Sequence, residues 1–105
     1  MSQRDAYIAI ADATRREILD LLRTRGPLLA GEIAAEFGDA SRPGISRHLR
    51  VLRECGVVPP RKDGKTQVYT LNQEPLVKLR DGWLARFGDM QRDSLKALRR
   101  RVERG

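Results

Sequence analysis

The residues with the most distinctive chemistry lie between Ser41 and Gly56, in the stretch SRPGISRHLRVLRECG. At helical spacing, Ile45, Leu49 and Leu52 fall on one face, and this face is expected to pack on the protein core. The other faces carry hydrogen-bond donors, most of them cations: Arg42, Ser46, Arg47, Arg50 and Arg53. A short helix with one apolar stripe and a row of arginines is suited to an anionic groove such as the DNA major groove.

The ends of this segment also favour a helix. Ser41 can cap its first turn by accepting a backbone N–H, Pro43 is tolerated in that turn, and Gly56 can end the helix in the left-handed conformation. Small residues near the start, Ser41 and Gly44 among them, would let the backbone approach base edges closely. We therefore interpret the segment as a recognition helix.

Arginine can pair bidentately with guanine O6 and N7, so Arg42 and Arg47 are predicted to contact base edges. Phosphate contacts, which set the register on the duplex, are predicted for Arg50 and for polar residues of the following hairpin. The complete predicted DNA-binding set is Ser41, Arg42, Gly44, Ser46, Arg47, His48, Arg50, Arg61, Lys62, Lys65 and Gln67.

The charge distribution agrees with this interpretation. The chain has a formal net charge of +7 over 105 residues. Residues 1–40 hold five basic and seven acidic side chains, whereas residues 41–65 hold seven basic and two acidic, and residues 92–105 hold six basic and two acidic. Neutralisation of phosphates requires a basic surface concentrated in this way. The alternative for each basic cluster is a solvated face that only aids solubility.

Two helices are predicted before the helix-turn-helix. Residues 4–11 form a short apolar helix that must dock on a larger element. Residues 12–26 form a second helix, with Asp12 as one possible N-cap, a Thr14–Glu17 capping box as another, and Gly26–Pro27 at its end. Arg15 in its first turn could contact a phosphate or form a structural ion pair.

A third helix is predicted over residues 28–37, with Leu29, Ile33, Ala34 and Phe37 on its buried side. A tight turn containing Gly38 then leads into the recognition helix. Two short helices joined by such a turn have the layout of a helix-turn-helix, here residues 28–56.

Residues 57–71 predict a β-hairpin. Asp63-Gly64 is a hairpin-turn signal, and the alternation beyond it places Tyr69 and Leu71 on one face. Pro59 and Pro60 cannot donate ladder hydrogen bonds, so the first strand is expected to be a short edge strand. A helix-turn-helix followed by a basic-tipped hairpin is a winged helix, which gives a mainly α fold with a small β wing.

The C-terminal region predicts a long helix over residues 75–104, in which Gly82 and Gly88 favour a bend or break. Its apolar stripe is too long for one small domain to cover, and a second copy could cover it around a two-fold axis. Folding of this helix back on its own domain is the alternative. Residues 1–11 and 75–104 are thus predicted dimerisation helices within a single domain of 1–105. The predicted interface residues are Tyr7, Ile8, Leu79, Trp83, Phe87, Leu95 and Leu98.

The rest of the composition excludes several function classes. No apolar run approaches a membrane span and no secretory signal pattern is present, and a single cysteine favours the reducing cytoplasm. One cysteine and one histidine cannot build a dedicated metal site in one subunit, and no catalytic constellation or glycine-rich phosphate loop is present. We expect no metal, no cofactor and no enzymatic activity. Cys55 is interpreted as a small buried core residue, with a redox switch as the alternative.

The chain resembles the ArsR family of bacterial winged-helix repressors over nearly its whole length. The resemblance rests on ADATRREILDLL, on SRPGISRHLRVLRECGVV, which is similar to the family pattern SRPxxSxHLxxLxxxG, and on DGKTQVYTL. It implies a homodimer that binds an operator on double-stranded DNA, blocks transcription and often represses its own operon. The C-terminal PLVKLRDGWLARF resembles a branch of the family without the usual metal-site motifs.

The departures from metal-sensing members support that branch, since residues 28–37 contain no cysteine and the only histidine, His48, is in the recognition helix. The resemblance implies that an inducing signal, if present, is a partner protein, thiol oxidation or another effector. Two other function classes stay open: a winged helix used for protein–protein contact, and a sequence-indifferent nucleic-acid binder. Binding to DNA sequences across a salt series discriminates among them.

Overall fold

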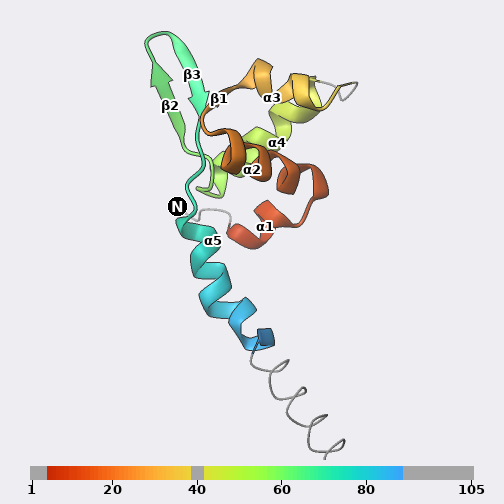
Figure 1. Cartoon of the computed structure of the whole chain (residues 1–105), viewed down its shortest axis with the longest axis vertical. Helices are drawn as coiled ribbons and strands as arrows, with labels where there is room; N and C mark the ends of the chain where they lie inside the picture. Colours follow the sequence, from red (N-terminus) through yellow and green to blue (C-terminus); the bar gives the residue numbers. More distant parts are fainter. Residues whose placement is uncertain (1–4, 39–41, 89–105) are drawn as a thin grey trace, which may run out of the picture.

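The computed structural model describes residues 5–38 and 42–88 (Figure 1). Ser41, Leu95 and Leu98, which belong to the predicted sites, lie outside these residues. In chain order the elements are α1 (Ala6–Ile10), α2 (Ala13–Arg25), β1 (Leu28–Leu29), α3 (Ala30–Glu36), α4 (Arg42–Glu54), β2 (Pro60–Asp63), β3 (Thr66–Tyr69), α5 (Glu74–Leu79) and the π-helical turn η1 (Arg80–Leu84).

Side-chain caps start the first two helices. Asp5 accepts a 2.9 Å hydrogen bond from the backbone N–H of Tyr7, and Asp12 accepts one of 3.1 Å from that of Arg15. The prediction of Asp12 as the N-cap of α2 is thus confirmed. Gly26 ends α2 with φ +82°, a conformation that side chains with a Cβ rarely adopt, as its position before Pro27 led us to expect.

The predicted helix over residues 28–37 is wrong at its start. Leu28 and Leu29 form a strand, β1, that pairs antiparallel with Tyr69 and Val68 of β3. Leu28 is consequently the buried residue, at 5% exposure, whereas Leu29, predicted to be buried, is 38% exposed. Pairing with a strand some 40 residues away overrides the helical pattern, because the backbone groups of these two residues complete the edge of the sheet.

The sheet has the strand order β1-β3-β2, so β2 is an edge strand, as the two prolines at its start predict. Arg61 lies opposite Val68, and Lys62 lies opposite Gln67. Gly64, with φ +66°, occupies the first of two turn residues, the position that a type II′ hairpin turn gives to glycine. The wing is therefore present, and its tip is the turn after Asp63.

The hydrophobic core lies between α2, α3 and α4. The largest fully buried side chains are Ile18, Ile33, Leu52, Val57 and Val58. The predicted core stripe of α4 is confirmed, since Ile45, Leu49 and Leu52 are all buried, and Cys55 is buried beside it. Because this stripe is buried, the opposite side of α4 faces solvent.

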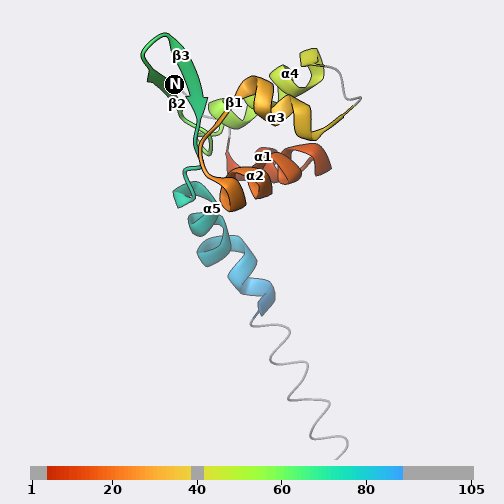
Figure 2. The same cartoon turned by 45° about the horizontal axis from the view of Figure 1, so that its top comes forward.

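The helix α1 contacts α2, α4 and α5, which confirms that this short element docks on larger ones. The side chain of Asn72 lies at the start of α5. Its Nδ2 donates to the carbonyl of Gly56, and its Oδ1 accepts from the backbone N–H of Glu74. Near Gly82, where a bend or break of the helix was expected, the hydrogen bonding widens to the π-helical turn η1. Figures 1 and 2 show that α5 leaves the body at the end opposite the hairpin, α3 and the start of α4.

Within the described residues, no helix has the length and apolar character needed to cross a membrane.

Candidate nucleic-acid interface

The exposed side of α4 carries the donors expected of a recognition helix. Ser46, Arg47 and Arg50 are exposed, and Gly44 is half-buried, while the apolar stripe on the opposite side is buried. Arg42 is the first residue of the helix, and Ser41 lies outside the described residues. The predicted division of α4 into a core-facing and a solvent-facing side is confirmed.

The helix α3 supports α4 from one side through small residues. Ala30, Gly31 and Ala34 of α3 line a cavity of about 190 Å³ together with Ile45, Ser46 and Leu49 of α4. An ion pair between Arg25 and Glu36 joins the end of α2 to the end of α3. The helix α3 is thus held on α2 by this surface ion pair as well as by the core.

The wing adds further cations. Arg61, Lys62 and Lys65 are exposed, whereas Gln67 is half-buried on the central strand β3. Both views in Figures 1 and 2 show the hairpin and the α3–α4 pair projecting at the same end of the body. The hairpin and the start of α4, two elements that carry predicted cations, therefore lie at one end of the molecule.

His48 is oriented differently from the other predicted DNA-binding residues. Its side chain is 26% exposed and faces the start of α2, where its Nδ1 lies 3.3 Å from Nη1 of Arg15 and its Nε2 lies 3.8 Å from a carboxylate oxygen of Asp12. Arg15, for which a phosphate contact and a structural role were both open, also donates to two carbonyls at the end of α1. Sequence reasoning missed this cluster, because nothing local relates Arg15 to a residue 33 positions later.

The cluster also affects the electrostatics of Asp12. The pKa of its carboxyl group lies below the ordinary 3.8, chiefly because the side chain accepts the backbone N–H of Arg15. Desolvation raises this pKa, but by less than the Arg15 hydrogen bond lowers it. The neighbouring His48 and the Arg15 guanidinium lower the pKa further. The carboxylate is therefore stabilised in its charged form at the point where α2 meets α4.

The other end of the molecule exposes apolar side chains. Tyr7, Ile8, Trp83, Leu84 and Phe87 are between 40% and 47% exposed. Trp83 packs edge-on against Tyr7 and against Phe87, with ring centroids 5.6 Å and 4.6 Å apart. Leu84 was not among the predicted interface residues, although its place in the apolar stripe could have indicated it. We call Tyr7, Ile8, Trp83, Leu84 and Phe87 the aromatic face.

Leu79, which was predicted at the interface, has a different environment from the aromatic face. It is 7% exposed in the single chain, because it packs toward α1. Leu79 therefore holds α5 on its own domain and leaves little surface for a partner.

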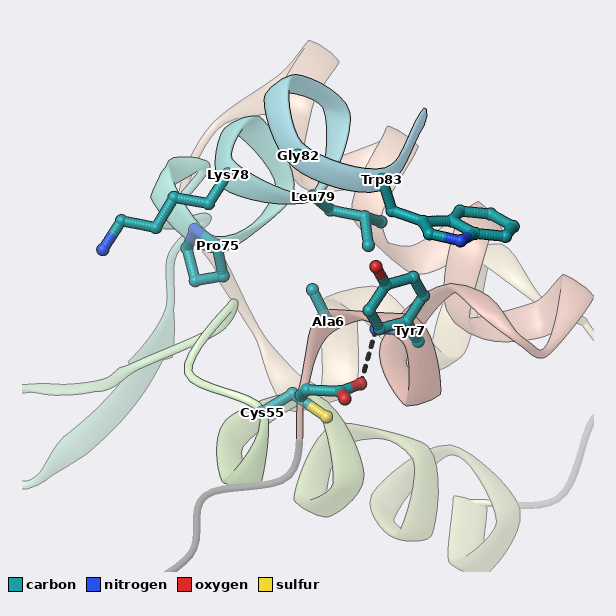
Figure 3. Close-up of a pocket in the computed structure, with 9 residues that line it drawn as sticks. Ala6, Tyr7, Cys55, Pro75, Lys78, Leu79, Gly82 and Trp83 are labelled. Carbon is teal, nitrogen blue, oxygen red and sulfur yellow. Dashed lines mark hydrogen bonds between the residues drawn. The ribbon is translucent and has the colours of Figure 1, made fainter. Parts of the chain in front are cut away.

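An apolar pocket of about 330 Å³ lies between α1, the end of α4 and α5 (Figure 3). Ala6 and Tyr7 line it on one side, Leu79 and Trp83 on another, and Cys55 at its base.

Within residues 5–38 and 42–88, no cluster of three or more histidine, cysteine, aspartate or glutamate side chains is arranged to hold a metal ion.

A family model described as a helix-turn-helix domain matches residues 10–59. The chain is 43% identical to the transcriptional repressor SdpR of Bacillus subtilis over 68 residues, 65% of this chain and 73% of the relative. It is 43% identical to the HTH-type transcriptional regulator Rv2034 of Mycobacterium tuberculosis over 75 residues, 71% of this chain and 68% of the relative.

Solved structures agree with these sequence relatives. A possible transcriptional regulator for arsenical resistance is 41% identical, with a TM-score of 0.68, over 90% of this chain and 93% of the other. An ArsR-like transcriptional regulator from Rhodococcus sp. RHA1 is 32% identical, with a TM-score of 0.67, over 90% and 86% of the two chains.

Proposed function

Because the chain belongs to the ArsR family of winged helix-turn-helix transcriptional repressors, we propose that it represses transcription as a homodimer bound to an inverted-repeat operator. The region upstream of its own gene is the first candidate operator, since autorepression is common in the family. DNA binding and transcription regulation follow from the family itself. The dimer, the operator symmetry and the residue roles are proposed here.

The observation that carries the proposal is the segregation of chemistry between the two ends of the molecule. The hairpin and the start of α4, elements with exposed cations, lie at one end, and α5, whose continuation carries Trp83 and Phe87 of the aromatic face, leaves the body at the other. A DNA-bound dimer needs this arrangement, because its cations must face phosphates while its apolar side chains are removed from water.

On DNA, the solvent-facing side of α4 would enter the major groove. Arg47 is the proposed base-reading residue and Arg42 the second, while Ser46 and Gly44 permit close approach. Arg50 and the wing residues Arg61, Lys62, Lys65 and Gln67 would contact phosphates and fix the register.

The aromatic face is the proposed contact between two copies. A two-fold axis through this face would pair Tyr7, Trp83 and Phe87 with their equivalents and leave both α4 helices free. Two recognition helices related in this way read half-sites about one helical turn apart. A repressor of this kind needs no cofactor and performs no reaction, works in the cytoplasm where the chromosome lies, and leaves the inducing signal to a partner protein or small effector.

The test is binding of the full chain to a random-duplex library and to its own upstream region, across a salt series. We expect tight binding to an inverted repeat with half-sites about one helical turn apart. Weak and steeply salt-dependent binding without a preferred sequence would overturn the proposal in favour of a sequence-indifferent nucleic-acid binder. Absence of duplex binding would instead favour a protein partner for the basic end.

A further inference from the structure

We propose that Arg15 and His48 form a positioning link that sets the orientation of the recognition helix α4 relative to α1. In this role His48 affects operator affinity through Arg15 and not through contact with DNA. The inference rests on the proposed function for its consequence, but the link itself is a property of the single chain.

The side chain of Arg15, a residue of α2, is held against α1 by two hydrogen bonds. Its Nη2 donates to the carbonyl of Ile8 at 2.8 Å, and its Nε donates to the carbonyl of Ala9 at 3.2 Å. The carbonyl of Ile8 also accepts the backbone N–H of Ala11 at 3.3 Å, so Arg15 adds a second donor to a carbonyl in the last turn of α1. The planar guanidinium presents its donors in a fixed geometry, and two bonds are enough to fix the plane of the group.

A third donor of the same guanidinium reaches the recognition helix. Nη1 of Arg15 lies 3.3 Å from Nδ1 of His48. Because arginine has donors and no acceptor, Nδ1 must accept, and a neutral His48 must carry its proton on Nε2. That N–H faces the carboxylate of Asp12 at 3.8 Å, too far for a hydrogen bond but close enough for attraction. The Asp12 side chain is itself held by the backbone N–H of Arg15.

The hydrogen bonds of the link constrain the orientation of α4, which its apolar core contacts do not. Ile45, Leu49 and Leu52 hold the helix through apolar burial, which is not directional. Base reading by the adjacent Arg47 requires placement to within a fraction of an ångström, and supporting hydrogen bonds provide such precision. His48 is the residue next to Arg47 and is bonded to α2 and, through Arg15, to α1.

The link also extends toward the aromatic face. Tyr7 of α1, one residue before Ile8, packs against Trp83 at 5.6 Å. A displacement of α1 at the aromatic face would therefore move the two carbonyls that hold Arg15, and with them the bond to His48. This gives a physical connection between the proposed dimer contact and the reading helix.

The first experiment measures the link without DNA. His48 is the only histidine of the chain, so the imidazole nitrogen NMR signals of the full-length protein are unambiguous. We expect the wild type to show the tautomer protonated at Nε2, and Arg15→Ala to shift the Nδ1 signal and mix the tautomers. Arg16→Ala is the matched control, because Arg16 donates to Ile10 of α1 at 2.6 Å and should leave the spectrum unchanged. Identical spectra for the wild type and Arg15→Ala would overturn the proposal.

The second experiment measures the consequence on the duplex that the wild type selects. His48→Ala and Arg15→Ala should each lower affinity about 10-fold, and the double variant should be no weaker than either one, because both remove the same interaction. His48→Asn should restore affinity, since its amide oxygen can accept in place of Nδ1, whereas Arg16→Ala should stay near wild type. Circular dichroism at the assay temperature verifies that each variant is folded.

The salt series separates positioning from contact. A positioning His48 leaves the slope of log affinity against log salt unchanged, whereas loss of a phosphate contact lowers it by about one. Additive losses, a reduced slope for His48→Ala or failure of His48→Asn to rescue would each overturn the proposal. If the wild type selects no duplex, the proposed function fails and the consequence for affinity fails with it, while the spectra still report separately whether the bond exists.

Discussion

The two ends of the molecule differ in how completely one chain covers its apolar surface. At the α4 end, the apolar stripe of the helix is buried in the core and the exposed residues, such as Arg47 and Arg50, are charged. At the α1–α5 end, Trp83 and Phe87 stay exposed although they pack on each other. A single chain therefore buries the apolar side chains at the first end and leaves those at the second end exposed to water.

This difference separates two kinds of binding. Exposed cations attract a polyanion at long range, and their contribution to the binding free energy falls as the salt concentration rises. Clustered aromatic side chains gain free energy only when a second apolar surface excludes water from them, and salt weakens this contribution little. The two ends should consequently respond to different substitutions and to different solution conditions.

The largest effect is expected from the aromatic face. Trp83→Asp should convert a dimer into a monomer at micromolar concentration, because a carboxylate would replace the central ring of the cluster. Affinity for the inverted repeat should fall more than about 100-fold, since each monomer would read one half-site. Analytical ultracentrifugation and duplex binding measure the two effects. Lys78→Ala is the control, because it changes a residue of the same helix that pairs with Glu74 and is not part of the aromatic face, and a monomeric wild type would contradict the prediction.

A smaller effect is expected at the reading helix. Arg47→Ala should cost about 1–3 kcal/mol of binding free energy and relax the preference at one base position, while the dimer persists. Affinity for a panel of single-base operator variants measures both quantities. Arg53→Ala, an exposed cation in the last turn of the same helix, should leave the base preference unchanged. Unaltered affinity and selectivity for Arg47→Ala would remove this residue from the proposed interface.

The wing should contribute less and without sequence preference. Lys65→Ala removes an exposed cation next to the turn glycine, and it should weaken every duplex by a similar factor. The salt slope should decrease by about one because one phosphate contact is lost. A salt titration with two unrelated duplexes is the measurement, and Lys78→Ala at the opposite end should keep the wild-type slope. A loss confined to one sequence would instead assign Lys65 to base reading.

The smallest effect concerns stability at the start of α2. The pKa of Asp12 is lower in the fold than its ordinary 3.8, so the charged carboxylate stabilises the fold above about pH 4, and this contribution is lost as pH falls through the lowered pKa. Asp12→Asn keeps an N-cap of similar quality but removes the charge. The variant should melt at a lower temperature than the wild type at pH 7, and the difference should be smaller at pH 2.5. An equal difference at both pH values would show that the carboxylate charge is not the cause.

Much of the α4 site could be predicted from the sequence because its determinants are local. The spacing of Ile45, Leu49 and Leu52 dictates which side of a helix is apolar, and this in turn exposes Arg47 and Arg50. His48 shows the limit of such reasoning. It was placed in the predicted DNA-binding set, whereas in the structure its ring faces the guanidinium of Arg15 on α2.

The sequence by itself determined the features governed by neighbouring residues. These are the cap at Asp12, the positive-φ glycines at the ends of α2 and α4, the edge strand after Pro59 and the division of α4. The tertiary structure decided that Leu28 and Leu29 form a strand, that Leu79 is buried and that Arg15 joins α1 to α4. Each of these depends on groups from segments distant in the chain, and local spacing carries no information about which distant segment supplies the partner.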